Sequence, residues 1–340
     1  MNKPSELASP PRAALQQLIG AYRFSQLVYV AAELRIADQL KDGARSIEEL
    51  ARVSGAHPES LYRVLRTLAS AGIFDQLEGK RFALNASAEY LRGDAPGSLR
   101  AQAVLAGQLF YSTWGSLLCS IKTGENAFEY THGMNLWEYC EQNPAVGRVF
   151  AAAMSERVFF TAAAVVDAYD FSRFRRIVDV GGGQGVLLAA VLRANLSAQG
   201  VLFDQTQVVQ SAQEALGAAG VLPRCELVAG DFFDQVPGEG DAYILSAILH
   251  DWDDARSAQI LKNCRRAMQA NQTLLIIERV IESDRPTLQA AEADMIMMVI
   301  AGGRQRTRAE HQSLLKGAGF ELTNVIATSH QEQIIEAKSV

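Results

Sequence analysis

Residues 178–185 read Val-Asp-Val-Gly-Gly-Gly-Gln-Gly. An apolar run at 177–180 ends in this glycine-rich stretch, and a helical pattern follows at 186–195. The order predicts a strand, a tight turn and a helix, a unit in which a nucleotide-like ligand can approach backbone N–H groups because glycine has no Cβ. Gly181, Gly183 and Gly185 form G-x-G-x-G, whereas Val186 stands where the dinucleotide fingerprint G-x-G-x-x-G requires its third glycine.

Three later apolar runs also end in polar or aromatic residues. The first ends at Asp204, whose carboxylate could accept both ribose hydroxyls of an adenosine. The second ends in Asp231 and Phe232. The Asp231 carboxylate could accept a hydrogen bond from the exocyclic amine of an adenine, and the Phe232 ring could cover that base. The third ends at His250. In open α/β sheets the ligand binds at the carboxyl ends of the strands, so we expect these residues to converge on one crevice.

These motifs, together with Gly-Gly-Arg-Gln-Arg-Thr at 302–307, resemble those of the S-adenosylmethionine-dependent O-methyltransferases. The group includes plant caffeic acid and isoflavone enzymes, animal hydroxyindole enzymes, and bacterial enzymes that tailor phenazines and antibiotics. The chain looks nearest to the bacterial members. The resemblance implies an α/β fold: a Rossmann-like, seven-stranded methyltransferase domain preceded by a mostly helical, winged-helix dimerisation domain.

The resemblance also implies the cofactor site. S-adenosylmethionine is the expected cofactor, with S-adenosylhomocysteine as product and no metal. Its methionine part and ribose would lie against the glycine turn, Asp204 would bind the ribose, and Asp231 with Phe232 would hold the adenine. Ser246 stands where plant members carry a lysine, four residues before the histidine. Asp179, an acid within a strand, is expected to hold the turn or to face the cofactor's amino group.

His250 is the expected general base, because imidazole can take the proton of a phenol as its oxygen attacks the methyl group. Glu278 matches the first glutamate that orients this histidine in the family. The second falls at Gln305, a neutral amide that would stabilise an imidazolium less than a carboxylate does.

The expected substrate is the phenolic hydroxyl of a flat, apolar, multi-ring molecule, a phenazine or an aromatic polyketide of secondary metabolism. Methionines would adapt to its faces. Residues in the segments that line the pocket in the family are Tyr111, Trp114, Phe150, Met154, Asp294, Met297 and Met298. Methionine and aromatic residues at helical spacing are also common in ordinary cores.

Composition narrows the class of protein. The 340 residues are 49% hydrophobic and carry a net charge of −6, which argues against a nucleic-acid partner. Four cysteines without a CxxC pair fit free thiols in a reducing compartment. We see no signal peptide and no apolar run near twenty residues, so we expect a cytoplasmic protein without a membrane partner.

Along the chain we expect a flexible tail at 1–12, the helical, winged-helix domain at 13–165 and the cofactor-binding catalytic domain at 166–340. A capping box at Ser46 and Glu49 starts one helix, and His57-Pro58 starts the next. The apolar stripes of the first domain predict a homodimer. The predicted strands lie at 176–181, 200–204, 224–230, 241–248, 272–279, 320–326 and 332–336.

Other interpretations stay open. His250, Asp251, Asp253 and Asp254 could suggest metal ligands, but the last two sit where a helix N-terminus favours acids. The functional alternatives are a family member that binds the cofactor but catalyses another reaction, a nicotinamide oxidoreductase, and a winged-helix regulator that binds DNA.

Overall fold

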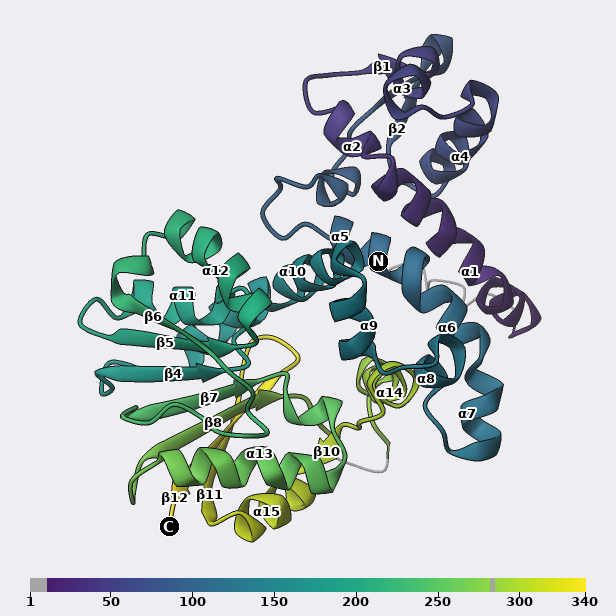
Figure 1. The fold of residues 1–340 in the computed structure, drawn as a ribbon. Coiled ribbons are helices and arrows are strands. Elements are labelled where there is room, and N and C mark those ends of the chain that lie inside the picture. The colour runs from purple at the N-terminus through teal and green to yellow at the C-terminus, as the bar shows by residue number, and fades with distance from the viewer. Residues whose placement is uncertain (1–10, 282–284) are drawn as a thin grey trace, which may run out of the picture. The chain divides into compact units, whose positions relative to one another are not determined.

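The computed structural model describes residues 11–281 and 285–340 (Figure 1). Its contacts divide the chain into two compact units, one ending at Tyr111 and the other formed by Ser112–Val340. The helices after Ser112 therefore share a unit with the large sheet; the boundary predicted between residues 165 and 166 stays a prediction. The expected tail lies outside the described residues, except that Pro11 and Arg12 already belong to the first helix.

The N-terminal unit is mostly helical. Its helices and helical turns are α1 (Pro11–Glu33), α2 (Ile36–Gln39), α3 (Ile47–Ser54), α4 (Pro58–Ser70), η1 (Glu78–Lys80), η2 (Ala88–Leu91), α5 (Arg100–Leu105) and η3 (Ala106–Phe110). The predicted capping box is present: Ser46 Oγ accepts from the Glu49 N–H, and Glu49 accepts from the Ser46 N–H. Gly55 ends α3 in the left-handed conformation, φ 70°, which glycine adopts without a Cβ penalty.

A small three-stranded antiparallel sheet forms the predicted wing. Its order is β1 (Arg45–Ser46), β3 (Arg81–Ala83) and β2 (Asp75–Leu77). The turn at Glu78–Lys80 joins the wing strands β2 and β3. The strand β1 was not predicted, since two residues leave no periodic signal.

The C-terminal unit contains a seven-stranded sheet in the order β11-β12-β8-β7-β4-β5-β6. The strands are β4 (Arg176–Val180), β5 (Gln199–Asp204), β6 (Cys225–Ala229), β7 (Ala242–Ser246), β8 (Thr273–Glu278), β11 (Phe320–Ala327) and β12 (Gln333–Ser339). The five from β4 to β8 are parallel, and the terminal hairpin adds two antiparallel strands. All seven predicted strands are present within a few residues of their expected bounds.

Side chains alternate between the two faces of this sheet. Ile177, Ile244 and Ile277 pack on one face, with α10 (Pro144–Ala168), α11 (Val186–Ala194) and α12 (Thr206–Ala218). Val178 and Ile276 pack on the other, with α13 (Asp254–Ala267) and α15 (Arg308–Gly317). Figure 1 shows these two helical layers on either side of the strands. Burial on both faces explains the nearly continuous apolar runs.

The strand order places the site. From β4 the chain builds outward through β5 and β6, then returns to place β7 on the other side of β4. A crevice opens where such a sheet reverses its order, outside the carboxyl ends of the two strands. The glycine turn follows β4 and the His250 segment follows β7, so both lie at this point.

The C-terminal unit contains further helices, helical turns and a short strand pair outside the seven-stranded sheet. They are α6 (Tyr111–Gly115, which begins at the unit boundary), α7 (Leu117–Thr123), α8 (Ala127–His132), α9 (Leu136–Gln142), η4 (Leu222–Arg224), η5 (Leu249–Asp251), α14 (Leu288–Ile296), η6 (Met297–Ala301) and the parallel pair β9 (Val280–Ile281) and β10 (Arg306–Thr307). Within the described ranges, α10 alone is long and apolar enough to cross a membrane by length and composition, contrary to our expectation from the sequence. Its Ala162 and Val165 pack in the core beside α11.

Candidate active site

The glycine turn after β4 has the predicted conformation. Gly181, Gly183 and Gly185 have φ of 72°, 57° and 75°, in the left-handed region that disfavours other residues. A Cβ on Gly181 would lie 2.4 Å from Ile248 Cδ1, and one on Gly185 would lie 2.7 Å from Leu216. A Cβ on Gly183 would meet no atom within 4 Å. The turn is closed on its protein side and open at Gly183, where a ligand can approach the backbone.

Two carboxylates lie behind this turn. Asp204, at the end of β5, accepts from the Gly183 N–H at 2.8 Å and from the Gln205 N–H at 2.7 Å. Asp179 is 1% exposed, and neither of its oxygens has a hydrogen-bond partner among the described residues. Burial, with the nearby charge of Asp204, raises the pKa of Asp179 to about 7. The turn is therefore not held by Asp179 side-chain hydrogen bonds, one of the two roles considered from the sequence.

The residues expected at the adenine lie beside the turn. Phe232 Cε1 comes within 3.5 Å of the Cβ position of Gly181, and the Phe232 ring packs edge-on against Trp252 at 6.3 Å. Asp231 is exposed and accepts from the Phe233 N–H at 2.7 Å. An aromatic face, an accessible carboxylate and an open glycine turn thus share one edge of the sheet.

These residues fit S-adenosylmethionine. The turn offers room and backbone groups at Gly183, Asp204 offers carboxylate oxygens, and Phe232 offers a ring face. The unpartnered, buried carboxyl of Asp179 could interact favourably with a cationic ligand. Ser246 ends β7 and is half-buried, and Ala247 after it has φ 55°, a conformation that turns the chain into η5.

His250 lies in η5, directly after that turn. Its side chain is 4% exposed, Nε2 lies 3.5 Å from Asp251 Oδ1, and Nδ1 has no hydrogen-bond partner among the described residues. Burial, reinforced by the charges of Arg157, Arg279 and other basic groups, lowers the pKa of His250 well below its usual value. The imidazole is therefore neutral near pH 7 and able to accept a proton.

Glu278 and Gln305 lie in the same region but are arranged differently from the pattern that the resemblance implied. Glu278 Oε1 accepts from the His250 backbone N–H at 3.0 Å, so this contact orients the main chain and not the ring. Burial raises the pKa of Glu278 to about 7. Gln305 is 4% exposed, its N–H donates to Asp294 Oδ1 at 2.8 Å, and its side-chain amide has no partner among the described residues.

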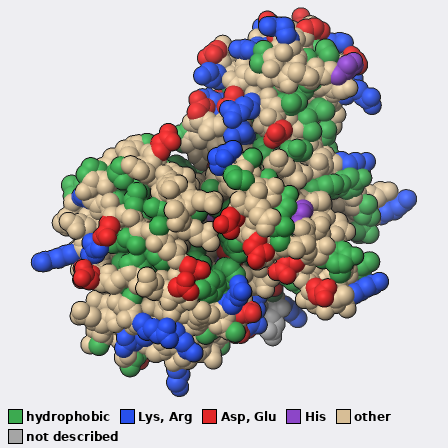
Figure 2. Space-filling view, viewed as in Figure 1, with side chains coloured by type: hydrophobic (Ala, Val, Ile, Leu, Met, Phe, Trp, Pro, Cys, Tyr) green, Lys and Arg blue, Asp and Glu red, His purple; other side chains and the backbone are tan. Residues whose placement is uncertain are grey.

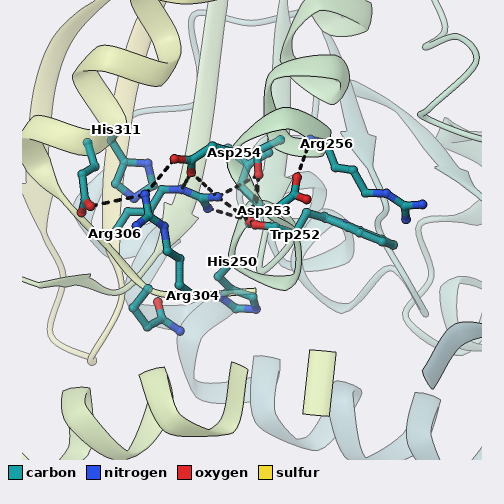
Figure 3. A network of polar contacts seen from close by, with 12 residues as sticks. His250, Trp252, Asp253, Asp254, Arg256, Arg304, Arg306 and His311 are labelled. Carbon is teal, nitrogen blue, oxygen red and sulfur yellow. Dashed lines mark hydrogen bonds and ion pairs between the residues drawn. The ribbon is translucent and has the colours of Figure 1, made fainter. Parts of the chain in front are cut away.

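Arg306 holds the segment that carries His250, a contact that sequence reasoning did not identify (Figure 3). The Arg306 side chain is 1% exposed. Its guanidinium donates to the carbonyls of Leu249 and Trp252 at 2.8 Å each, to Ser257 Oγ at 3.1 Å and to Asp254 at 3.0 Å. A backbone hydrogen bond also holds this segment: the Arg304 N–H donates to the His250 carbonyl at 2.9 Å.

The predicted substrate residues are found in several segments. Phe150 and Met154 lie half-buried on α10, Asp294 on α14, and Met297 and Met298 in η6, with Met297 6% exposed. Trp114 is 36% exposed on α6 and Tyr111 ends the N-terminal unit at 44% exposure. Their roles as pocket residues stay predictions.

The acids after His250 already have protein partners. Asp253 caps α13 by accepting from the Arg256 N–H at 2.8 Å, as expected at a helix start, and Asp254 pairs with Arg304 and Arg306. Over 11–281 and 285–340, no group of three or more His, Cys, Asp or Glu side chains could hold a metal ion.

Comparison with known proteins gives two family matches. Residues 114–321 match an O-methyltransferase domain, and residues 16–93 match an O-methyltransferase dimerisation domain. The chain is 44% identical over 333 residues to the phenazine O-methyltransferase PhzM of Lysobacter antibioticus, covering 98% of each chain.

Two solved structures are similar throughout. The crystal structure of LaPhzM has a TM-score of 0.95 at 44% identity, over 97% of this chain and 100% of that one. The crystal structure of NcsB1, an O-methyltransferase from neocarzinostatin biosynthesis, holds S-adenosylmethionine and 2-hydroxy-5-methyl naphthoic acid. It has a TM-score of 0.79 at 31% identity, over 93% of this chain and 96% of that one.

Proposed function

The chain belongs to the O-methyltransferase family whose members carry an N-terminal dimerisation domain and use S-adenosylmethionine, and we propose that it methylates a hydroxyl of a multi-ring aromatic molecule. A phenazine or an aromatic polyketide is the proposed substrate, by similarity to a named phenazine O-methyltransferase. The observation that carries the mechanism is His250. Its imidazole is neutral and buried beside the strand-order reversal of the sheet, and Nδ1 has no hydrogen-bond partner among the described residues.

The cofactor site is assigned to residues at four strand ends. When bound, S-adenosylmethionine supplies a methyl group activated by a positively charged sulfur. The residues proposed to hold it are Gly181, Gly183, Gly185, Asp204, Asp231, Phe232 and Ser246. Asp204 would exchange its hydrogen bond with the Gly183 N–H for ribose hydroxyls, and Phe232 would cover the adenine.

His250 is assigned the base role. A ring nitrogen would take the hydroxyl proton of the substrate as the substrate oxygen receives the methyl group, and the S–CH3 bond of the cofactor would break to leave S-adenosylhomocysteine. Asp251, 3.5 Å from Nε2, is the carboxyl nearest to the ring, and burial raises the pKa of Asp251 to about 8. An imidazolium at His250 would favour the ionised form of Asp251, so this pair can share the charge that arrives with the proton. Glu278 holds the backbone, and Gln305 offers an unpartnered amide for the ring or the substrate.

Dimerisation is assigned to the N-terminal unit. Leu15, Leu18, Ile19 and Tyr22 recur at helical spacing on α1 and are 59%, 73%, 67% and 53% exposed. A second copy that covers this stripe would remove the apolar surface from water. We assign a cytoplasmic location and no nucleic-acid or membrane partner, in keeping with the net charge of −6 and with basic side chains that stand among acidic ones on the face in Figure 2.

The test is methyl transfer itself. The purified protein is incubated with S-adenosylmethionine labelled in the methyl group and a panel of hydroxyphenazines, hydroxylated polyketides and simple phenols. We expect label in an ether of a multi-ring substrate, and loss of it with His250→Ala. Cofactor binding without transfer to any hydroxyl would favour another reaction on the same scaffold. If a nicotinamide cofactor, and not S-adenosylmethionine, protects the protein against thermal unfolding, the assignment of S-adenosylmethionine as the cofactor is wrong.

A further inference from the structure

A basic side chain on α10 has no hydrogen-bond or ion-pair partner among the residues that the structure describes. Arg157 lies half-buried on α10, and its guanidinium forms no hydrogen bond or ion pair with any residue of 11–281 or 285–340. A guanidinium presents five N–H donors in a planar fork that matches a carboxylate. The charge of a half-buried guanidinium must be stabilised by water or by an anion. The groups around Arg157 therefore indicate whether it could bind an anionic ligand.

The spacing on α10 places Arg157 on the face that borders the site. Phe150, Met154, Arg157 and Thr161 recur at intervals of four, three and four, which is one face of a helix. Near one end of that face the Phe150 ring packs on Trp137 at 5.6 Å, and Trp137 stacks on Trp252 at 5.9 Å.

At the other end of that face, Thr161 Oγ1 donates to Glu332 Oε2 at 3.0 Å, in the segment before β12. Arg157 lies between these two anchors. Its charge is felt at groups from three further segments, because it contributes to the shifted pKa values of His250, Asp251, Arg279 and Glu332.

The carboxyls nearby do not neutralise Arg157. Glu332 is engaged by His330 Nδ1 at 2.6 Å, by Thr161 and by Arg279 Nε at 3.5 Å. Burial raises the pKa of Asp251 to about 8, even against the charge of Arg157, so Asp251 keeps its proton at pH 7. A positive charge therefore remains on the face of α10 that carries the proposed substrate residues Phe150 and Met154.

We propose that Arg157 is the anion-recognition residue of the substrate pocket, and that the substrate is a hydroxylated multi-ring arene that also bears a carboxylate. This inference rests on the proposed function, since it adds a second recognition element to the same pocket. The guanidinium fork holds the carboxylate while Phe150 and Met154 contact the ring faces. The charge-assisted pair also orients the arene, so that its hydroxyl is presented to His250.

The experiment compares a hydroxyphenazine carboxylate with the matching carboxamide, which has the same shape and no charge. Binding is measured by quenching of tryptophan fluorescence with S-adenosylhomocysteine present, and KM and kcat are measured with S-adenosylmethionine. The wild type should bind the carboxylate at least ~10-fold more tightly. Arg157→Gln should weaken carboxylate binding by about 10- to 100-fold and change carboxamide binding by less than about 2-fold. Arg157→Lys should retain part of the preference, because it keeps the charge without the fork.

Arg148→Gln is the matched control. Arg148 is exposed on the same helix, nine residues earlier and so on the opposite side, and its loss should change neither ligand. Equal wild-type affinities for the two ligands, or equal loss of both in Arg157→Gln with unchanged thermal stability, would overturn the proposal.

If Arg157→Gln lowers kcat equally for both substrates, Arg157 acts at the reacting oxygen. That result would also reject its role in recognising the carboxylate. Methylation of the carboxamide without any carboxylate preference leaves the methyltransferase function standing while this inference fails. If the protein prefers the carboxylate in an Arg157-dependent way but transfers no methyl group, this inference stands while the proposed methyltransferase function fails.

Discussion

The guanidinium of Arg306 donates to the carbonyl oxygen of Leu249, the residue before His250, at 2.8 Å. The two residues are 57 positions apart in the chain. The same guanidinium reaches Trp252, so it spans both ends of the short segment that carries the proposed base. The backbone that carries the imidazole is thus held by a buried cation.

Arg306→Lys should therefore lower kcat more than it lowers affinity for the cofactor. A lysine ammonium cannot reach all four acceptors, and the segment of His250 would relax. Displacement by about 1 Å can cost on the order of 10²-fold in rate. We expect a kcat loss of about 10- to 100-fold with a KM for S-adenosylmethionine near that of the wild type. Steady-state kinetics at saturating aromatic substrate measure both.

Arg304→Lys is the control for this variant. The Arg304 side chain is 46% exposed and pairs with Asp254 and Glu310 at the surface, where ion pairs contribute little. It should leave kcat unchanged. If Arg306→Lys keeps full kcat, or if its loss of activity follows a fall in folded protein seen by thermal unfolding, Arg306 has no positioning role.

The sheet was predictable because its strands are mostly apolar runs, and those at β4, β5 and β6 end in glycine or an acid. The run at 176–181 became β4 at Arg176–Val180, and the terminal pair became β11 and β12. Elements without such a run were not predictable. The bridge of β9 with β10 needs two segments brought together by the fold, and the π-helical turn at Met297–Ala301 depends on packing that periodicity does not report.

The polar residues of the site were predictable for a related reason, since the carboxyl ends of parallel strands meet at one edge. Their partners were not. The resemblance implied that Glu278 orients the ring of His250. Only the fold reveals that the Glu278 carboxylate accepts a hydrogen bond from the backbone N–H of His250. Arg157 stands in a helix far from any motif, and its relevance emerges from where α10 packs.

Asp179→Asn should stabilise the protein at alkaline pH. The buried carboxyl has a pKa of about 7 when folded, against about 4 when unfolded. A raised folded pKa contributes stability that is fully present below the unfolded value and is lost as pH rises through the folded one. Thermal unfolding should show little change at pH 4 and a gain of a few degrees at pH 8. If the two proteins melt at the same temperature at pH 8, the prediction is wrong, and other groups stabilise the ionised Asp179 carboxylate.

Ile19→Glu should produce a monomer. The substitution puts a charge in the centre of the exposed apolar stripe on α1, where burial of an unpaired carboxylate is costly. Sedimentation at micromolar concentration should show a dimer for the wild type and a monomer for the variant. Gln17→Glu is the matched control, because Gln17 lies on the opposite side of the same helix and is also exposed. A wild-type monomer would contradict the assignment of this stripe.

Asp231→Asn should weaken the binding of S-adenosylmethionine by about 10-fold, the effect expected for a charge-assisted hydrogen bond that becomes neutral. Asparagine keeps an acceptor for the Phe233 N–H, so the turn should hold its shape. Calorimetric titration with the cofactor measures the affinity. An unchanged dissociation constant would mean that the adenine does not contact Asp231.

His250→Ala should retain cofactor binding and lose about 10²- to 10⁴-fold in turnover on a weakly acidic phenol, the scale of general-base removal. The loss should shrink as the phenol becomes more acidic, because an ionised phenolate needs no base. The lowered pKa of His250 keeps the imidazole in its accepting form at neutral pH, so wild-type turnover should fall only well below pH 6.5. Gln305→Glu should raise the pKa of His250 and help the least acidic phenols most. Rates measured against phenol acidity for the three proteins test both assignments. If His250→Ala and the wild type are equally active across that range, His250 only supports the fold and another group takes the proton.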